Sequence, residues 1–182
     1  MITRRMKWTY VALMAMLGLT SAAWAQEGAA AKSSGDATSA PSTSPVHYYS
    51  KQRVDAGCES KTGGDMLYNG DGGTRNFTLV MGARNAPGEG EVHMQFADVI
   101  FVVKGSATLV TGGKLSGAQE NAINPSTGKP FPKDEPRGPS VVGGESHHIA
   151  AGDVIVVPNG VPHWFSEVEG PLCYHLVKIR QP

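Results

Sequence analysis

Glu91, His93, Asp98 and His163 are the side chains of this sequence whose types could together do chemistry. Glu91 and His93 stand two positions apart, and on an extended strand such residues point to the same face. A buried carboxylate without a partner is costly and becomes neutral. Two carboxylates that face inward would therefore need a cation. That cation could be a metal ion, or Arg84 at the end of a preceding predicted strand, which could instead bind an anionic substrate.

The segment 152–163 predicts a strand, a tight turn and a second strand. Four β-branched residues in a row, 154–157, favour a strand that is buried on both sides. Pro158 ends this strand because it cannot donate to a sheet ladder, and Gly160 supplies the backbone freedom that the turn requires. The arrangement directs the imidazole of His163 to a fixed point.

The pattern G-x5-P-x-G-x2-H over 152–163, which ends in Pro-His-Trp, closely resembles the second conserved motif of the cupin superfamily. Upstream, Glu91-Val-His93, Asp98 and Gly105 resemble a modified first cupin motif. Glu91 takes the place of the first family histidine, and Asp98 takes the place of the family glutamate. Segments between residues 77 and 180 are similar to a group of small bacterial cupins. The resemblance implies an all-β, single RmlC-like jelly-roll β-barrel with one divalent transition metal (Mn, Fe, Ni or Zn), held by Glu91, His93, Asp98 and His163.

Short strands and many glycines dominate the rest of the domain, and no segment shows a helical period. The long polar stretch between 112 and 148 contains five prolines and predicts a loop. Structureless loops of that length are uncommon and are often binding loops or lids, although a surface insertion fits equally well. The His147-His148 pair near its end is expected on the loop surface. Strands are predicted over 77–81, 92–96, 99–103, 107–111, 154–157, 163–168 and 174–179.

The N-terminus has the layout of a secretory signal peptide. Residues 1–25 hold three basic residues, an apolar run and the small-residue site Ala23-Trp24-Ala25. Residues 26–45 are almost entirely Ala, Ser, Thr, Gly and Pro, which predicts a disordered linker. Residues 46–182 are the size of one domain. We therefore expect a periplasmic or secreted cupin.

Charge and cysteine usage limit the partners. Removing the three basic residues of the leader leaves 13 basic against 16 acidic residues, so no basic surface suggests nucleic acid. Cys58 and Cys173 are the two cysteines, and export permits a disulfide between them without requiring one. We expect a small-molecule substrate or ligand, no nucleic acid and no membrane in the mature form, and a homodimer stays open.

Two classes of function fit these features. The first is a metal-dependent enzyme, an oxygenase, lyase or isomerase, that acts on a small anionic or oxygen-rich molecule and uses Arg84 as a catalytic-site residue. The second is a non-catalytic module that binds a sugar-like ligand, with a structural metal or none. The fold alone cannot choose between them.

Overall fold

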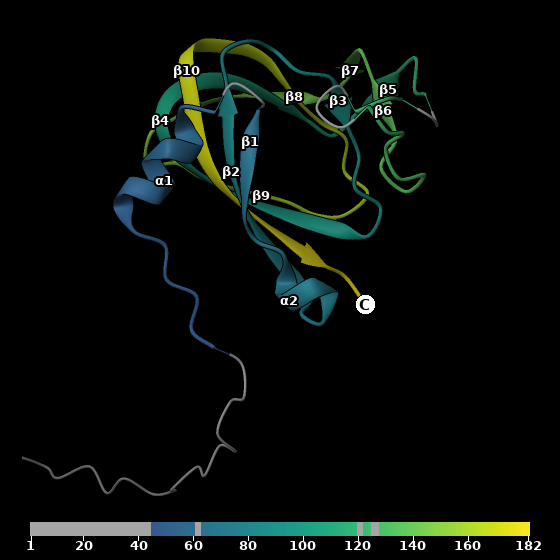
Figure 1. Ribbon diagram of the computed structural model, residues 1–182. Helices are drawn as coiled ribbons and strands as arrows, with labels where there is room; N and C mark the ends of the chain where they lie inside the picture. Colours follow the sequence, from purple (N-terminus) through teal and green to yellow (C-terminus); the bar gives the residue numbers. More distant parts are fainter. Residues whose placement is uncertain (1–44, 61–62, 120–121, 125–127) are drawn as a thin grey trace, which may run out of the picture. The chain divides into compact units, whose positions relative to one another are not determined.

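Two long bent strands, β4 (Phe96–Thr111) and β10 (His163–Arg180), organise the domain (Figure 1). They pair antiparallel along almost their whole length, with irregular register near the middle of β10. In the computed structural model the described residues are 45–60, 63–119, 122–124 and 128–182. The predicted signal peptide and all but the last residue of the predicted linker lie outside these residues.

The two halves of β4 and β10 belong to different layers. The first half of β4 and the second half of β10 lie beside β9 (Val154–Val157) and β2 (Phe77–Arg84), and β1 (Gly64–Tyr68) extends this layer. The other halves lie beside β8 (Glu145–Ala150) and β3 (Gly90–Glu91), and β6 (Arg137–Gly138) extends the second layer.

The bend of β4 occurs at Gly105. This residue has a φ of 78°, a conformation that residues with a Cβ rarely adopt, and a Cβ here would overlap the carbonyl oxygen of Pro171. Inward side chains fall on even numbers before the bend and on odd numbers after it, as in Ile100 and Leu109. The bend therefore keeps the same face of the strand toward the interior while the strand passes from one layer to the other.

The hydrophobic core lies between the two layers. Ile100, Val157 and Tyr174 come from the first layer, and Leu109 and Phe165 come from the second. The structure thus confirms the all-β prediction: bent antiparallel strands enclose a core in the jelly-roll manner. The strand predictions over 77–81, 99–103, 107–111, 154–157, 163–168 and 174–179 all fall inside observed strands.

Three strand and loop predictions were wrong in part. Residues 92–95 form no regular strand, because their backbone groups bond instead to the carbonyls of Asp134 and Pro136 and to the turn at Gly160. The strand β9 is not buried on both sides, since the side chains of Val154 and Val156 are 56% and 63% exposed.

The 112–148 stretch is also more ordered than predicted. Its described part contains the short strands β5 (Lys114–Ser116), β6 and β7 (Ser140–Val142), and β8 begins at its end. Because β5 and β7 pair with each other, the segment folds back across the second layer instead of extending as a free loop. The His147-His148 pair lies in β8 and not in a loop.

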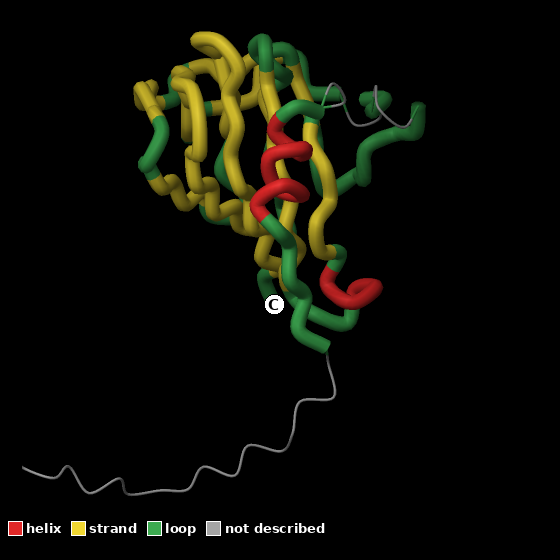
Figure 2. The backbone as a smooth tube through the Cα atoms, turned by 60° about the vertical axis from the view of Figure 1, so that its left-hand side comes forward, coloured by secondary structure: helices red, strands yellow, loops and turns green. Residues whose placement is uncertain are grey.

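One helix was not predicted. α1 (Lys51–Cys58) begins after Ser50, whose side chain accepts a hydrogen bond from the backbone N–H of Arg53. It lies across the outer face of the strands (Figure 2), so closely that a Cβ at Gly57 would be 2.8 Å from Cβ of Met81. The sequence of α1 shows little amphipathic pattern, because the helix packs on the strands through Gly57 and not through a stripe of apolar side chains. The short turn labelled α2 (Gly70–Gly73) joins β1 to β2.

A disulfide joins Cys58 at the end of α1 to Cys173 in β10. This settles the pairing that the sequence left open. Within the described residues, no helix is long and apolar enough to cross a membrane.

Candidate metal centre

All four predicted ligands face one buried point between the layers. Glu91 ends β3, His93 follows it, Asp98 lies in β4, and His163 is the first residue of β10. The β10 register places His163 directly opposite Glu91. The side chains of His93, Asp98 and His163 are at most 3% exposed, and that of Glu91 is 12% exposed.

Glu91, His93 and His163 form the tightest group. One donor atom from each lies within 4.8 Å of the other two, so this cluster could hold a metal ion. Asp98 stands outside that set, although its Oδ2 is 3.4 Å from Nε2 of His93 and 3.6 Å from Nε2 of His163. The structure therefore brings all four residues together, and whether Asp98 also acts as a ligand stays a prediction.

The contacts of His163 test whether the site fits a cation. Nδ1 lies 3.1 Å from the carbonyl oxygen of Val161, so Nδ1 carries the proton and a neutral ring presents a lone pair at Nε2. Buried Nε2 has no hydrogen-bond partner among the described residues and lies 3.6 Å from carboxylate oxygens of both Glu91 and Asp98. A lone pair that faces two carboxylates is repulsive unless a positive charge lies between them. A proton or a metal ion on Nε2 supplies that charge, so the site fits a metal.

His93 is held by two residues that the sequence analysis did not identify. Its buried Nδ1 lies 3.4 Å from Oε1 of Glu135, close but without hydrogen-bond geometry, and a carboxylate at this nitrogen is a common partner of imidazole ligands in metal sites. Its Nε2 lies 2.9 Å from the ammonium of Lys178, which is also 3.8 Å from Oδ1 of Asp98. The lysine thus occupies the nitrogen that a metal would use, and metal uptake requires the ammonium to move away.

Two arginines flank Glu91. Arg137 forms an ion pair with Oε2 of Glu91, and Nη2 of Arg84 lies 3.9 Å from Oε1. Burial favours the neutral carboxyl, but the contact with His163 and the charge of Arg137 outweigh it and hold the pKa of Glu91 well below its usual range. Glu91 is therefore ionised and is the principal anion of the cluster.

Asp98 and His163 are shifted in the opposite direction. Burial raises the pKa of Asp98, and the nearby charges of Lys178 and His93 offset only part of that effect. Burial also opposes a proton on His163, but contact with the Glu91 carboxylate outweighs it and raises the pKa of the imidazole. The cluster therefore favours a positive charge beside Glu91, supplied by a proton when no metal is bound.

A cavity of about 410 Å³ adjoins the cluster. Glu91 and His93 form part of its wall, and Arg84, Tyr174 and Lys178 form another part. The 112–148 segment contributes the remaining polar and aromatic side chains: Asn124, Phe131, Pro132, Glu135 and Arg137. This placement favours the binding-loop interpretation of that segment over a surface insertion.

The residues missed from sequence lie far from both motifs. Lys178 occupies an inward position of β10, and only strand parity counted from Tyr174 through Leu176 could have suggested it. Glu135 carried no signal, because its stretch was expected to be a loop, and Arg137 belonged to the segments that resemble small bacterial cupins but was given no role. His147 lies on β8, where it contacts Thr111 with its side chain 41% exposed, outside the cluster.

Comparisons with known proteins agree with the geometry but add no activity. No protein-family model matches the sequence, and no curated protein matches it. The structure is similar to that of a Bacillus halodurans protein, with 11% identity, a TM-score of 0.49, and coverage of 77% of this chain and 86% of the other. A Klebsiella pneumoniae protein with a double-stranded β-helix domain shares 15% identity over 75% of this chain and 91% of its own, with a TM-score of 0.46.

A cupin-like protein from Thermotoga maritima shares 16% identity over 65% of this chain and 67% of its own, with a TM-score of 0.42. The chain's own features agree with the resemblance to the cupin superfamily that its sequence shows. The turn that carries His163, the two strands that bend between layers, and the buried Glu-His-His cluster between those layers are combined in one domain.

Proposed function

We propose that the protein is a metal-dependent enzyme that acts on a small anionic or oxygen-rich molecule. The observation that carries the proposal is the buried Nε2 of His163, which has no hydrogen-bond partner among the described residues and faces two carboxylate oxygens beside a cavity of small-molecule size. Nitrogen and oxygen donors of this kind suit Mn, Fe, Ni or Zn. When bound, such an ion supplies Lewis acidity or redox chemistry to a molecule in the cavity.

The residues of the chain have separate tasks in this proposal. Glu91, His93 and His163 hold the ion, and Asp98 completes the set of donors. Glu135 and the carbonyl of Val161 orient the two imidazoles through their Nδ1 atoms. The described residues of the 112–148 segment line the cavity, where they would limit the access of water.

The decisive experiment measures metal content and turnover together. The purified mature protein is loaded separately with Mn, Fe, Ni and Zn, analysed by elemental methods, and tested on a panel of small carboxylates, enols and sugars. We expect about one ion per chain and turnover that a chelator abolishes. Chelator-insensitive binding without turnover would refute the enzyme and indicate a binding module instead.

We also propose that the mature protein is exported and begins at Gln26. The leader pattern of residues 1–25 motivates this proposal. The Cys58–Cys173 disulfide supports it, because structural disulfides persist mainly in oxidising compartments. N-terminal sequencing of the protein from fractionated cells tests it, and a cytosolic chain that retains residues 1–25 would refute it.

A further inference from the structure

We infer that Arg84 and Arg137 form a carboxylate-binding site at the cavity wall, so that the substrate is a short carboxylate with a second oxygen donor. The inference deepens the proposed function and rests on it. Both guanidinium groups line the cavity that also contains Glu91 and His93. A carboxylate held by the arginines therefore leaves the other end of a short molecule facing the cluster.

The two guanidinium groups are fixed in place before any ligand arrives. Arg84 lies over the ring of Phe165, with Cζ 4.7 Å from the ring centroid, and its Nε donates to the hydroxyl of Tyr174 at 3.1 Å. Arg137 lies over the ring of Phe131 at 4.0 Å. Stacking of this kind holds the planes of both groups, which favours the parallel two-point contacts that carboxylates make.

Arg137 also has an unused donor. Its Nε is buried and has no hydrogen-bond partner among the described residues, although Nη1 is paired with Glu91 and Nη2 lies 3.9 Å from Glu135. A buried donor without a partner is rare in folded proteins and indicates a ligand, a water or an ion. The side chain is 15% exposed and lines the cavity, so a ligand in the cavity can reach the guanidinium group, and it reaches Nε itself only if the side chain shifts.

The charges around the cavity require an anion once a metal is bound. Arg84, Arg137 and Lys178 are three cations, and they face the three carboxylates of Glu91, Asp98 and Glu135. These six groups balance one another, so the proton that the metal-free cluster holds beside Glu91 leaves one net positive charge. A divalent ion that replaces this proton leaves two positive charges, and Glu91 must then be shared between the ion and both arginines. A dianionic ligand restores the balance and gives the arginines a carboxylate of their own.

A second cavity adjoins the first. It has a volume of about 660 Å³ and shares Arg84, Arg137 and Phe131 with the cavity beside the cluster. The two arginines thus lie where both cavities meet, and a molecule that spans the two cavities contacts them. This position suits residues that select a substrate by its charge.

The test compares malonate with malonamide, a neutral molecule of nearly the same shape. Binding to the metal-loaded protein is measured by calorimetry, with metal content determined on the same samples. We expect malonate to bind at least tenfold more tightly than malonamide. Arg84→Gln and Arg137→Gln should each weaken malonate by about tenfold to a hundredfold, the usual effect of losing a charge-assisted pair. Arg84→Lys keeps the charge but loses the planar fork, so its affinity for malonate should lie between those of the wild type and Arg84→Gln.

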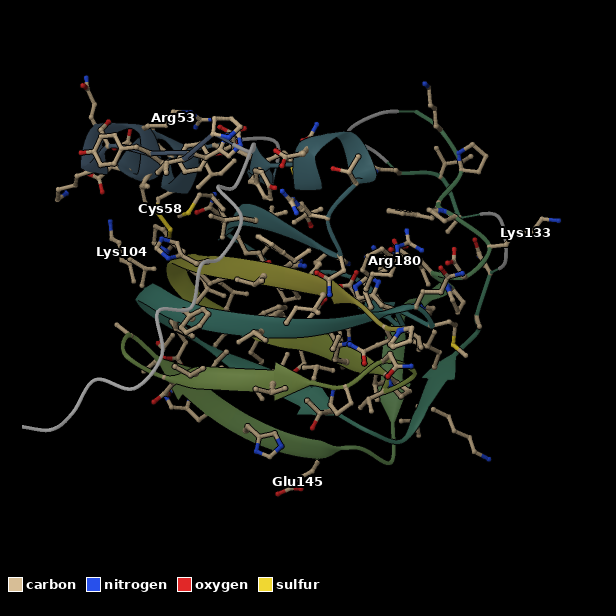
Figure 3. All side chains as sticks on the ribbon, turned by 90° about the horizontal axis from the view of Figure 1, so that it is seen from below. Arg53, Cys58, Lys104, Lys133, Glu145 and Arg180 are labelled. Carbon is tan, nitrogen blue, oxygen red and sulfur yellow. A yellow bond between two sulfur atoms is a disulfide. The ribbon has the colours of Figure 1, made fainter. Side chains whose placement is uncertain are left out.

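Arg53→Gln is the matched control. Arg53 lies on α1 and forms an ion pair with Asp65. It lies away from Lys133, which belongs to the 112–148 segment (Figure 3). This variant should bind malonate like the wild type. Circular dichroism of every variant separates a lost contact from a lost fold.

The outcomes separate the two proposals. A protein that takes up metal but binds malonate and malonamide equally, or whose Arg84→Gln and Arg137→Gln variants stay within twofold of wild type, overturns the carboxylate site alone. A protein that takes up no metal but still binds malonate through the arginines overturns the metal-dependent function and keeps the site. Failure of both metal uptake and malonate binding overturns both proposals.

Discussion

Removal of the Cys58–Cys173 disulfide should cost the domain a large part of its stability. The bond closes a loop with a sequence separation of 115 residues. For a loop of this length the loss of chain entropy in the unfolded state corresponds to about 5 kcal/mol at 25 °C. Measured values for native disulfides commonly range from about 2 to 5 kcal/mol. We therefore expect the free energy of unfolding to fall by about 3–5 kcal/mol.

The position of the bond determines how this loss should appear. Cys173 is 1% exposed and pairs in register with Ala83 of β2, whereas Cys58 ends α1, which lies on the outer face of the sheet. The reduced domain should therefore release α1 before the two layers separate. At about 4 °C per kcal/mol for a domain of this size, Tm should fall by about 15 °C.

Urea unfolding of three samples measures the effect, with the fluorescence of Trp164 as the probe of the folded barrel. The samples are the oxidised wild type, the wild type in reductant, and the Cys58→Ala/Cys173→Ala double variant. Reduced wild type retains both sulfur atoms, so its difference from the double variant isolates packing from the cross-link. The reasoning is refuted if reduction changes the free energy of unfolding by less than about 1 kcal/mol, well under the expected range.

Three further predictions concern the site. His163→Ala should remove most metal binding, because it deletes a neutral donor and leaves carboxylates facing each other. The control His147→Ala should keep metal binding, and equal metal content in both variants would contradict the assignment. Lys178→Met should raise metal affinity at least tenfold, about 1.4 kcal/mol, because no ammonium then occupies the ligand nitrogen; unchanged affinity in a metal titration would show that the lysine does not compete. Gly82→Ala should destabilise the fold by about 1–3 kcal/mol, because its Cβ would overlap the buried ring of Tyr174, whereas Tyr174→Phe keeps the ring; thermal unfolding compares them, and equal Tm values would contradict the overlap.

The fold was predictable because its signals are local. Pro158 and Gly160 define a turn of one particular shape, and Gly160 indeed has a φ of 76° there. Alternation along β10 and the apolar runs of β4 predicted strands that the structure contains. The joining of those short strands into two long ones depends on bends at glycines. At each such glycine the local sequence pattern predicts the end of a strand, whereas in the structure the strand bends and continues.

The burial of β9 was predicted wrongly although the strand itself was predicted correctly. A run of four β-branched residues resembles a strand from the middle of a fully covered sheet. Among the described residues β9 pairs only with β4, and the outward face that carries Val154 and Val156 is exposed. Sequence reports the preference for a strand, but the cover over each face depends on which elements pack there.

The electrostatics of the site could not be derived from the motifs. Two carboxylates and two imidazoles would by themselves neutralise a divalent ion and leave it a weak electrophile. The structure adds Arg84, Arg137 and Lys178 against one more carboxylate, Glu135. These residues come from β2, β6, β10 and the stretch before β6, and only the folded arrangement of both layers brings them to one cavity.

This arrangement changes what the donor set implies for chemistry. Glu91 shares its charge with two arginines, so it can give less electron density to a metal than an isolated carboxylate could. A ligand carboxylate that shares the charge of Arg84 and Arg137, without moving them, would return part of the Glu91 charge to the metal. Substrate binding at the arginines would then adjust the metal's electrophilicity in the same step that positions the substrate. Malonate should accordingly tighten metal binding in the wild type, and by linkage metal should tighten malonate by the same factor. Independent binding of the two, measured by calorimetry in both orders, would show that Glu91 does not couple them.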